Sequence, residues 1–200
     1  MSDAGLEVDG LHSALAGPFS FSIEPSACLV ISGPSGSGKS LLLRLVADLD
    51  AGTGTVRLNA EDRAVLASPI WRERCPYVAA TPGFWEQTAA DHFAPDRQDE
   101  ARALAEAMRF DSARFNAPVA LLSTGERQRI ALVRALMLNA PALLLDEPTG
   151  PLDQYTTGAV ADLLAERVAK GLSLLLVTHD EALAERLATD RREMRDRRFA

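Results

Sequence analysis

Residues 33–40 read Gly-Pro-Ser-Gly-Ser-Gly-Lys-Ser, and they follow a short apolar run, Cys28–Ser32. Leucine and valine then recur at helical spacing over residues 41–49. This order of strand, glycine-rich loop and helix is the context in which the pattern G-x-x-x-x-G-K followed by Ser or Thr binds phosphate. Glycines let the backbone wrap an anion, so that successive N–H groups and the helix N-terminus face it. The segment therefore predicts a phosphate-binding loop.

Two side chains of this loop have predicted roles toward a bound triphosphate. Lys39 reaches the β- and γ-phosphates, and the Ser40 hydroxyl is a ligand for Mg²⁺. The other members of the loop contact the nucleotide through their backbone: Gly33, Pro34, Ser35, Gly36, Ser37 and Gly38.

Strand and helix patterns alternate in the rest of the chain. Ala142–Leu145 is predicted to be a buried strand, a helical pattern follows it, and Ser173–Val177 is a third strand. Such alternation implies a parallel sheet with right-handed crossovers. We expect one α/β domain over residues 1–200, with a P-loop NTPase core and a mainly parallel sheet.

Three segments depart from this alternation. Leu6–Val8 and Phe19–Ile23 are expected to form a small antiparallel part with one solvated face. Residues 83–137 lack strand runs and show helical ones, so they are predicted to be an inserted helical subdomain. The last eleven residues, rich in arginine, are expected to form a solvated tail or an edge strand.

Two adjacent carboxylates, Asp146 and Glu147, end the strand that begins at Ala142. Ligand sites in open parallel sheets form just beyond the carboxyl ends of strands. Magnesium takes few protein ligands besides water and phosphate oxygens, so Ser40 and Asp146 suffice as its ligands. Glu147 then lies toward the γ-phosphate, where a carboxylate orients or deprotonates an attacking water.

Composition excludes several classes of function. The chain has 21 Lys+Arg against 28 Asp+Glu, a net charge of −7, so we expect no nucleic-acid partner. No apolar stretch approaches the roughly 20 residues of a membrane-spanning helix. The first residues show no secretion signal, which favours a cytoplasmic location. Cys28 and Cys75 are expected to be buried thiols rather than a disulfide or metal site.

Two further motifs complete a family pattern. Leu122-Ser-Thr-Gly-Glu126 resembles the signature sequence of ABC-type ATPases, and His179 stands where that family has its switch histidine. Together with the loop and the carboxylates, these motifs match the nucleotide-binding subunit of ABC transporters over nearly the whole chain. The resemblance implies that ATP and Mg²⁺ are the cofactors, that Glu147, His179 and Lys39 are catalytic, and that Gly150–Asp153 is the D-loop.

The resemblance also implies an assembly. Ser123 and the Gly125 N–H would form a second anion site that meets the γ-phosphate held by Lys39 of another copy. The resemblance also implies that Asp153 is a nucleotide-binding residue. ATP would then join two subunits, either identical copies or paralogues. By the same resemblance the chain is an ATPase that powers a separately encoded membrane permease, peripheral on the inner face of the cell membrane. The short length and the Tyr77–Pro82 region are also somewhat similar to small bacterial metal-export ATPases.

Several positions depart from the family pattern. Ala80 stands where the Q-loop glutamine is usual, which predicts slower or less tightly coupled hydrolysis. The adenine-stacking aromatic is missing, because the matching stretch His12–Leu15 offers only a histidine or a leucine. Gly150 and Thr124 replace a common D-loop serine and the first signature glycine, and the dimer interface is expected to tolerate Thr124.

The aromatic residues Phe84 and Trp85 lie beside Ala80 in the sequence and allow two interpretations. They either line a groove that receives a cytoplasmic helix of the permease, or they fill the core of the helical subdomain. Two alternative functions stay open as well. One is a nucleotide-binding regulatory or assembly module with little hydrolysis, and the other is a P-loop kinase, which the signature motif and Glu147 oppose.

Overall fold

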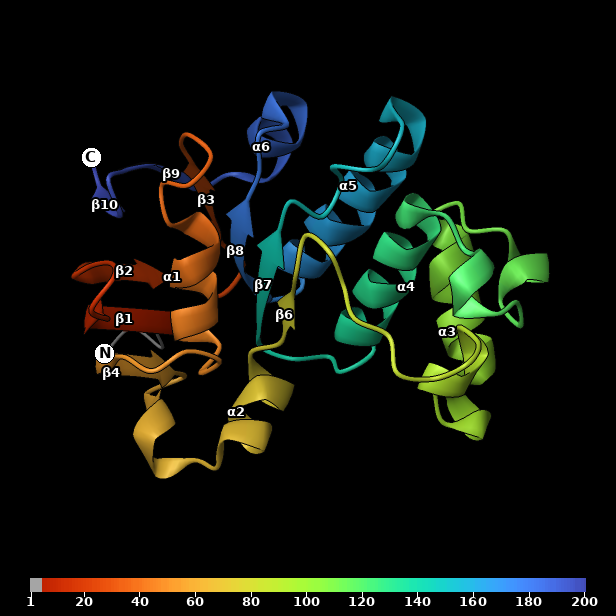
Figure 1. Ribbon diagram of the computed structural model, residues 1–200, viewed down its shortest axis with the longest axis horizontal. Coiled ribbons are helices and arrows are strands. Elements are labelled where there is room, and N and C mark those ends of the chain that lie inside the picture. Colours follow the sequence, from red (N-terminus) through yellow and green to blue (C-terminus); the bar gives the residue numbers. More distant parts are fainter. Residues whose placement is uncertain (1–4) are drawn as a thin grey trace.

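The computed structural model describes residues 5–200. The prediction that no secretion signal is present concerns the N-terminus, and residues 1–4 of it lie outside the described residues. Figure 1 shows a central sheet with helices on both faces. Its strand order is β10-β9-β3-β8-β7-β6, and all neighbours except the β9–β10 pair run parallel. The strands are β3 (Cys28–Ser32), β6 (Tyr77–Val78), β7 (Ala142–Asp146), β8 (Ser173–Val177), β9 (Asp190–Arg195) and β10 (Arg198–Phe199). The predicted α/β class and mainly parallel sheet are confirmed.

A second, antiparallel sheet lies beside α1 (Figure 1). Its order is β2-β1-β4-β5, with β1 (Leu6–His12), β2 (Phe19–Ile23), β4 (Thr53–Leu58) and β5 (Glu61–Asp62). Phe19, Phe21 and Ile23 are buried while the serines between them are exposed, as the alternating pattern predicts. Sequence inspection missed β4, in which Val56 and Leu58 are buried and Arg57 between them is exposed.

The parallel strands are apolar on both faces and therefore contribute to two cores. Leu143 and Leu145 of β7 pack with the helices α3 (Gln98–Ala107), α4 (Thr124–Leu136), α5 (Gln154–Ala169) and α6 (Glu181–Leu187). Leu144 and Ala142 pack on the other side with α1 (Lys39–Val46), the antiparallel sheet and Trp71 of α2 (Ser68–Arg74). Successive side chains of a strand point to opposite faces of the sheet, so apolar residues at every position allow helices to pack on both faces.

Residues 83–137 contain α3, α4 and short 3₁₀ helices, with one isolated bridge, Thr88–Pro118, as strand pairing. The 3₁₀ helices of the described chain are Arg63–Val65, Ala90–His92, Pro95–Arg97, Ser112–Arg114 and Val119–Leu121. Figure 1 shows α4 on the far side of β6, β7 and β8 from α1. Whether residues 83–137 constitute a separate subdomain stays a prediction.

The C-terminal residues are an edge hairpin and not a free tail. β9 pairs in parallel with β3, and β10 folds back on β9 at the edge of the sheet. Cys28 and Cys75 are buried free thiols, as expected. Among residues 5–200, no helix has both the length and the apolar character that crossing a bilayer requires.

Candidate nucleotide site

The loop between β3 and α1 depends on two glycine positions. Gly33 has φ +139°, and a Cβ there would lie 2.2 Å from the carbonyl oxygen of Met194 in β9. Gly38 has φ +101° and forms the left-handed N-cap of α1. Residues other than glycine rarely adopt these backbone angles. The chain therefore turns sharply at both ends of the loop, and α1 points its N-terminus into the turn.

Lys39, the first residue of α1, lies inside the loop rather than in solvent. Its Nζ donates hydrogen bonds to the carbonyl oxygens of Gly33, at 2.6 Å, and Pro34, at 2.9 Å. The Ser37 hydroxyl is buried and has no hydrogen-bond partner among the described residues. A fixed ammonium, an unpartnered hydroxyl and the free N–H groups of a helix N-terminus fit the phosphates of a nucleotide. Ser40, one residue further on, is exposed.

Parallel pairing brings the carboxylates and the histidine together. In the β7–β8 register Asp146 faces Val177, so Glu147 and His179 follow at the same edge of the sheet. The N–H of Glu147 donates to the Val177 carbonyl at 2.9 Å, which extends this pairing by one residue. Residues far apart in the sequence thus share the edge at which the loop after β3 also lies.

Glu147 is held in an unusual conformation and contacts His179 twice. Its φ is +48°, a left-handed angle that is uncommon outside glycine and that clusters at functional sites. Its Oε2 accepts the N–H of His179 at 3.2 Å, and its Oε1 lies 3.3 Å from His179 Nε2. Oε1 is buried and accepts no hydrogen bond of good geometry within the described chain. One acceptor of Glu147 is therefore left for a further donor.

Asp146 has a hydrogen-bond partner that could not be expected from local sequence patterns. Its side chain is buried, and Tyr77 Oη donates to its Oδ2 at 3.0 Å across the pair of strands β6 and β7. Burial raises the pKa of the Tyr77 phenol, and the Asp146 charge raises it further, so Tyr77 stays protonated and donates. The other oxygen of Asp146 keeps its lone pairs, which suits a carboxylate ligand of a divalent cation.

Ser123 begins α4 as its N-cap and forms a reciprocal capping box with Glu126. Ser123 Oγ accepts the Glu126 N–H at 3.2 Å, and the Ser123 N–H donates to Glu126 Oε2 at 2.7 Å. A hydroxyl that accepts in this way still has its own proton to donate. Thr124 is exposed, so the added side chain at this position meets solvent.

The segment before α5 packs against the start of α4. A Cβ on Gly125 would lie 3.1 Å from the Leu152 side chain and 3.2 Å from the Pro151 carbonyl, which explains a glycine there. Asp153 caps α5, accepting the N–H groups of Tyr155 and Thr156. These hydrogen bonds, those from Thr156 first, lower the pKa of Asp153. Asp153 therefore has a structural role, as the N-cap of α5, that the family motif did not predict.

The predicted site residues fall into two groups. Asp146 is the last residue of β7, and the loop 33–40, Glu147 and His179 follow the carboxyl ends of β3, β7 and β8. Ser123 and Gly125 lie at the start of α4, and in the described chain no hydrogen bond or ion pair joins them to the loop.

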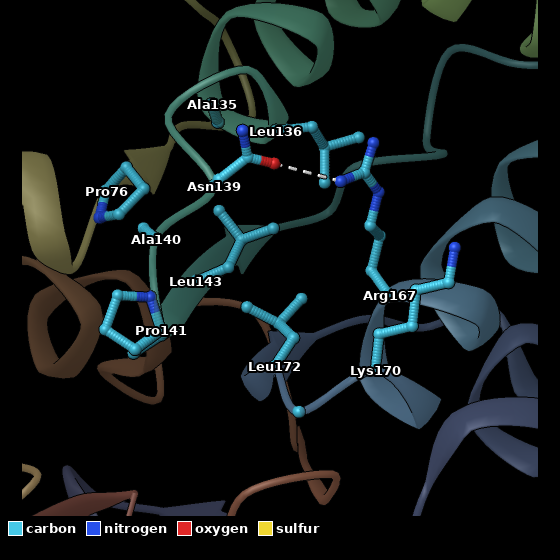
Figure 2. Close-up of a pocket in the computed structure, with 12 residues that line it drawn as sticks. Pro76, Ala135, Leu136, Asn139, Ala140, Pro141, Leu143, Arg167, Lys170 and Leu172 are labelled. Atoms are coloured by element: carbon cyan, nitrogen blue, oxygen red, sulfur yellow. Dashed lines mark hydrogen bonds between the residues drawn. The ribbon is translucent and has the colours of Figure 1, made fainter.

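A hollow of about 410 Å³ lies at the opposite, amino ends of β7 and β8, away from both groups. Figure 2 shows Asn139 and Arg167 among the side chains that line it. None of the predicted site residues lines it.

A glycine loop at a strand–helix junction, with paired carboxylates at the end of a neighbouring parallel strand, defines a P-loop nucleotide-binding ATPase. Comparison with known proteins specifies the class. Residues 17–150 match the family model described as ABC transporter. The chain is 36% identical over 171 residues to the probable iron export ATP-binding protein FetA of Escherichia coli strain K12, covering 80% of this chain and 76% of that protein.

Solved structures agree with this match. The structure of an ATP binding subunit of an ABC transporter superimposes with a TM-score of 0.86 at 25% identity, covering 97% of this chain and 87% of that one. A dimeric ATP-binding cassette in a post-hydrolysis state with ADP and phosphate has the same fold, with a TM-score of 0.85 at 21% identity and coverages of 97% and 96%. This chain belongs to the ABC transporter family and is an ATP-binding ATPase of it. It spans between 57% and 60% of the length of curated importer subunits that it also matches.

Proposed function

We propose that this chain is the motor subunit of a transporter, and that ATP with Mg²⁺ is bound between two copies. The observation that carries the proposal is the separation of two anion-binding elements within one chain. The loop 33–40 follows β3, whereas Ser123 caps α4, which lies on the far side of β6 from α1 (Figure 1). Gly125 of that helix packs against Pro151 and Leu152. A two-fold pair of chains brings Ser123 of one to the γ-phosphate held by Lys39 of the other.

Within each site, the described contacts suggest the division of work. Lys39 and the loop N–H groups bind the phosphates. Ser40 and Asp146 would hold Mg²⁺, which would supply charge neutralisation. Glu147 orients the attacking water through Oε1, the carboxylate oxygen that accepts no hydrogen bond within the described chain. His179 positions Glu147 through the two contacts described above, and it is then placed to sense the γ-phosphate.

A test of the shared site uses Ser123, because two substitutions there keep the helix cap. Aspartate is as good an N-cap as serine, so Ser123→Asp leaves α4 capped but places a carboxylate against the γ-phosphate. In a Glu147→Gln background, which stops hydrolysis, ATP is expected to produce dimers in sedimentation velocity runs. Ser123→Asp abolishes those dimers without weakening nucleotide binding, and Ser123→Thr retains them. Dimers that persist with Ser123→Asp refute the arrangement.

We further propose that the permease docks beside Trp85, on the cytoplasmic face of the membrane. A groove of about 360 Å³ is lined there by Trp85, His92, Arg134 and Leu138 with the segment around Ala79. Trp85 is 70% exposed, so it does not fill the core of the helical part, whereas Phe84 is half-buried against that core. Of the two sequence interpretations, the core-filling one is therefore wrong for Trp85.

Arg134 holds one side of this groove together through a hydrogen bond and a cation–π contact. Arg134 donates to the Gly83 carbonyl at 3.0 Å, and its guanidinium lies 4.4 Å from the centre of the Trp85 ring. An ordered, exposed tryptophan beside a cation is typical of binding anchors. Trp85→Ala is expected to abolish co-purification with the permease at an unchanged melting temperature. Val65→Ala, at a similarly exposed apolar residue elsewhere, is the matched control. Unchanged permease binding by Trp85→Ala would contradict the docking proposal.

A further inference from the structure

The loop after β1, where the family's base-stacking aromatic residue is missing, contacts the β9–β10 hairpin at the C-terminal end of the chain. The loop after β1 carries Leu15, whose side chain is 60% exposed. Two backbone hydrogen bonds, each 3.0 Å, tie the β9–β10 turn to its neighbours: Gly17 N–H donates to the Arg197 carbonyl, and Arg197 N–H donates to the Ser37 carbonyl. The turn thus lies between the loop after β1 and the phosphate-binding loop.

The Arg197 side chain follows the same path. Its Nη1 donates to the Leu15 carbonyl at 3.2 Å. Its stem passes Gly38, where an added Cβ would lie 3.2 Å from Arg197 Cγ. A hollow of about 600 Å³ opens here, lined by residues 34–37 of the phosphate-binding loop and by residues 195–197 of the turn. The hollow therefore joins the phosphate-binding loop to the turn that carries Arg197.

Arg197 differs from its neighbour Arg195 in its charge partners. Arg195 pairs with Glu193 at 2.7 Å, whereas Arg197 forms no ion pair within residues 5–200. Its guanidinium is therefore held in place by a neutral carbonyl, and the side chain is exposed. A guanidinium plane of this kind stacks on aromatic rings, which an ammonium does not.

We propose that Leu15 and Arg197 together form the platform for the nucleotide base and replace the missing aromatic residue. Leu15 supplies an apolar contact, and the Arg197 guanidinium stacks on the π face of the purine. The phosphates stay with Lys39, whose Nζ is already inside the loop. The inference rests on nucleotide binding at this loop, which titration of the unmodified protein checks separately.

The test separates the base from the phosphates by comparing Mg-ADP with Mg-pyrophosphate, neither of which the protein hydrolyses. Dissociation constants of the full chain are measured by isothermal titration calorimetry. Loss of an exposed cation–π contact is expected to weaken ADP binding by roughly 2- to 5-fold in Arg197→Ala. Arg197→Lys keeps the charge but not the plane, and it is expected to weaken ADP binding nearly as much. Pyrophosphate binding stays within about 2-fold of the unmodified protein in both variants.

Arg195→Ala is the matched control, because Arg195 lines the same hollow and is already paired. It is expected to leave both dissociation constants unchanged. Leu15→Tyr restores an aromatic ring and is expected to tighten ADP without affecting pyrophosphate. The proposal is overturned if Arg197→Ala leaves ADP binding intact, or if it weakens ADP and pyrophosphate equally, since the side chain then serves the phosphates or the fold.

Discussion

Replacing Tyr77 by phenylalanine removes one hydroxyl and leaves one oxygen of the buried Asp146 carboxylate without its donor. The lost contact is the 3.0 Å hydrogen bond from Tyr77 Oη to Asp146 Oδ2. Hydrogen bonds to charged groups contribute about 1.5–3 kcal/mol to the free energy of unfolding. Because 1 kcal/mol shifts the melting temperature of a chain this long by about 2–4 °C, we expect a decrease of roughly 3–12 °C. The unliganded protein is the right sample, since a bound cation would compensate the carboxylate.

A matched tyrosine is available in Tyr155. It is exposed, its ring faces the Arg109 guanidinium at 3.6 Å, and within the described chain its hydroxyl makes no hydrogen bond. Tyr155→Phe is therefore expected to change the unfolding free energy by less than about 0.5 kcal/mol. Differential scanning calorimetry of both variants gives the comparison. Equal shifts for the two substitutions would show that the Tyr77 hydroxyl does not stabilise the ionised Asp146.

Three further outcomes follow from single contacts. Gly33→Ala is expected to abolish nucleotide binding and lower the melting temperature, because the added Cβ would lie 2.2 Å from the Met194 carbonyl oxygen. Gly83→Ala is the control, because a Cβ at that position meets nothing within 4 Å. Ser123→Ala removes the α4 cap and is expected to cost about 1 kcal/mol in urea denaturation; a cost near zero would contradict the capping box. Ala80→Gln is expected to raise permease-stimulated ATP turnover, and unchanged turnover would show that this position does not limit hydrolysis.

Local patterns in the sequence were sufficient for the elements that form the centre of the fold. The strands β3, β7 and β8 are short apolar runs, and the structure places them within a residue of their predicted ends. The loop 33–40 was recognisable because glycine, lysine and serine have fixed spacing there. β6 could not be found in this way, because two residues, Tyr77 and Val78, carry no periodicity.

Long-range contacts account for what the sequence did not reveal. Tyr77 meets Asp146 only because β6 adds to the sheet beside β7, and Arg197 meets Leu15 only because β9 adds beside β3. Neither pair has a spacing that a local pattern could detect. Asp153 differs from these pairs, because its role is local: it is the N-cap of α5. The family motif assigned Asp153 to the nucleotide, so this capping role was not predicted.

The separation of the loop 33–40 from Ser123 leads to a last prediction about pairs of chains. In a two-fold dimer each nucleotide site takes its loop from one chain and its serine from the other. Lys39→Ala and Ser123→Asp, each in the Glu147→Gln background, are therefore expected to remain monomeric with ATP when alone. A mixture restores one composite site, built from the loop of the Ser123→Asp chain and the serine of the Lys39→Ala chain. Sedimentation velocity is expected to detect an ATP-dependent heterodimer only in the mixture. If both elements served one nucleotide within a single chain, mixing would restore nothing, so a mixture that stays monomeric refutes the shared site.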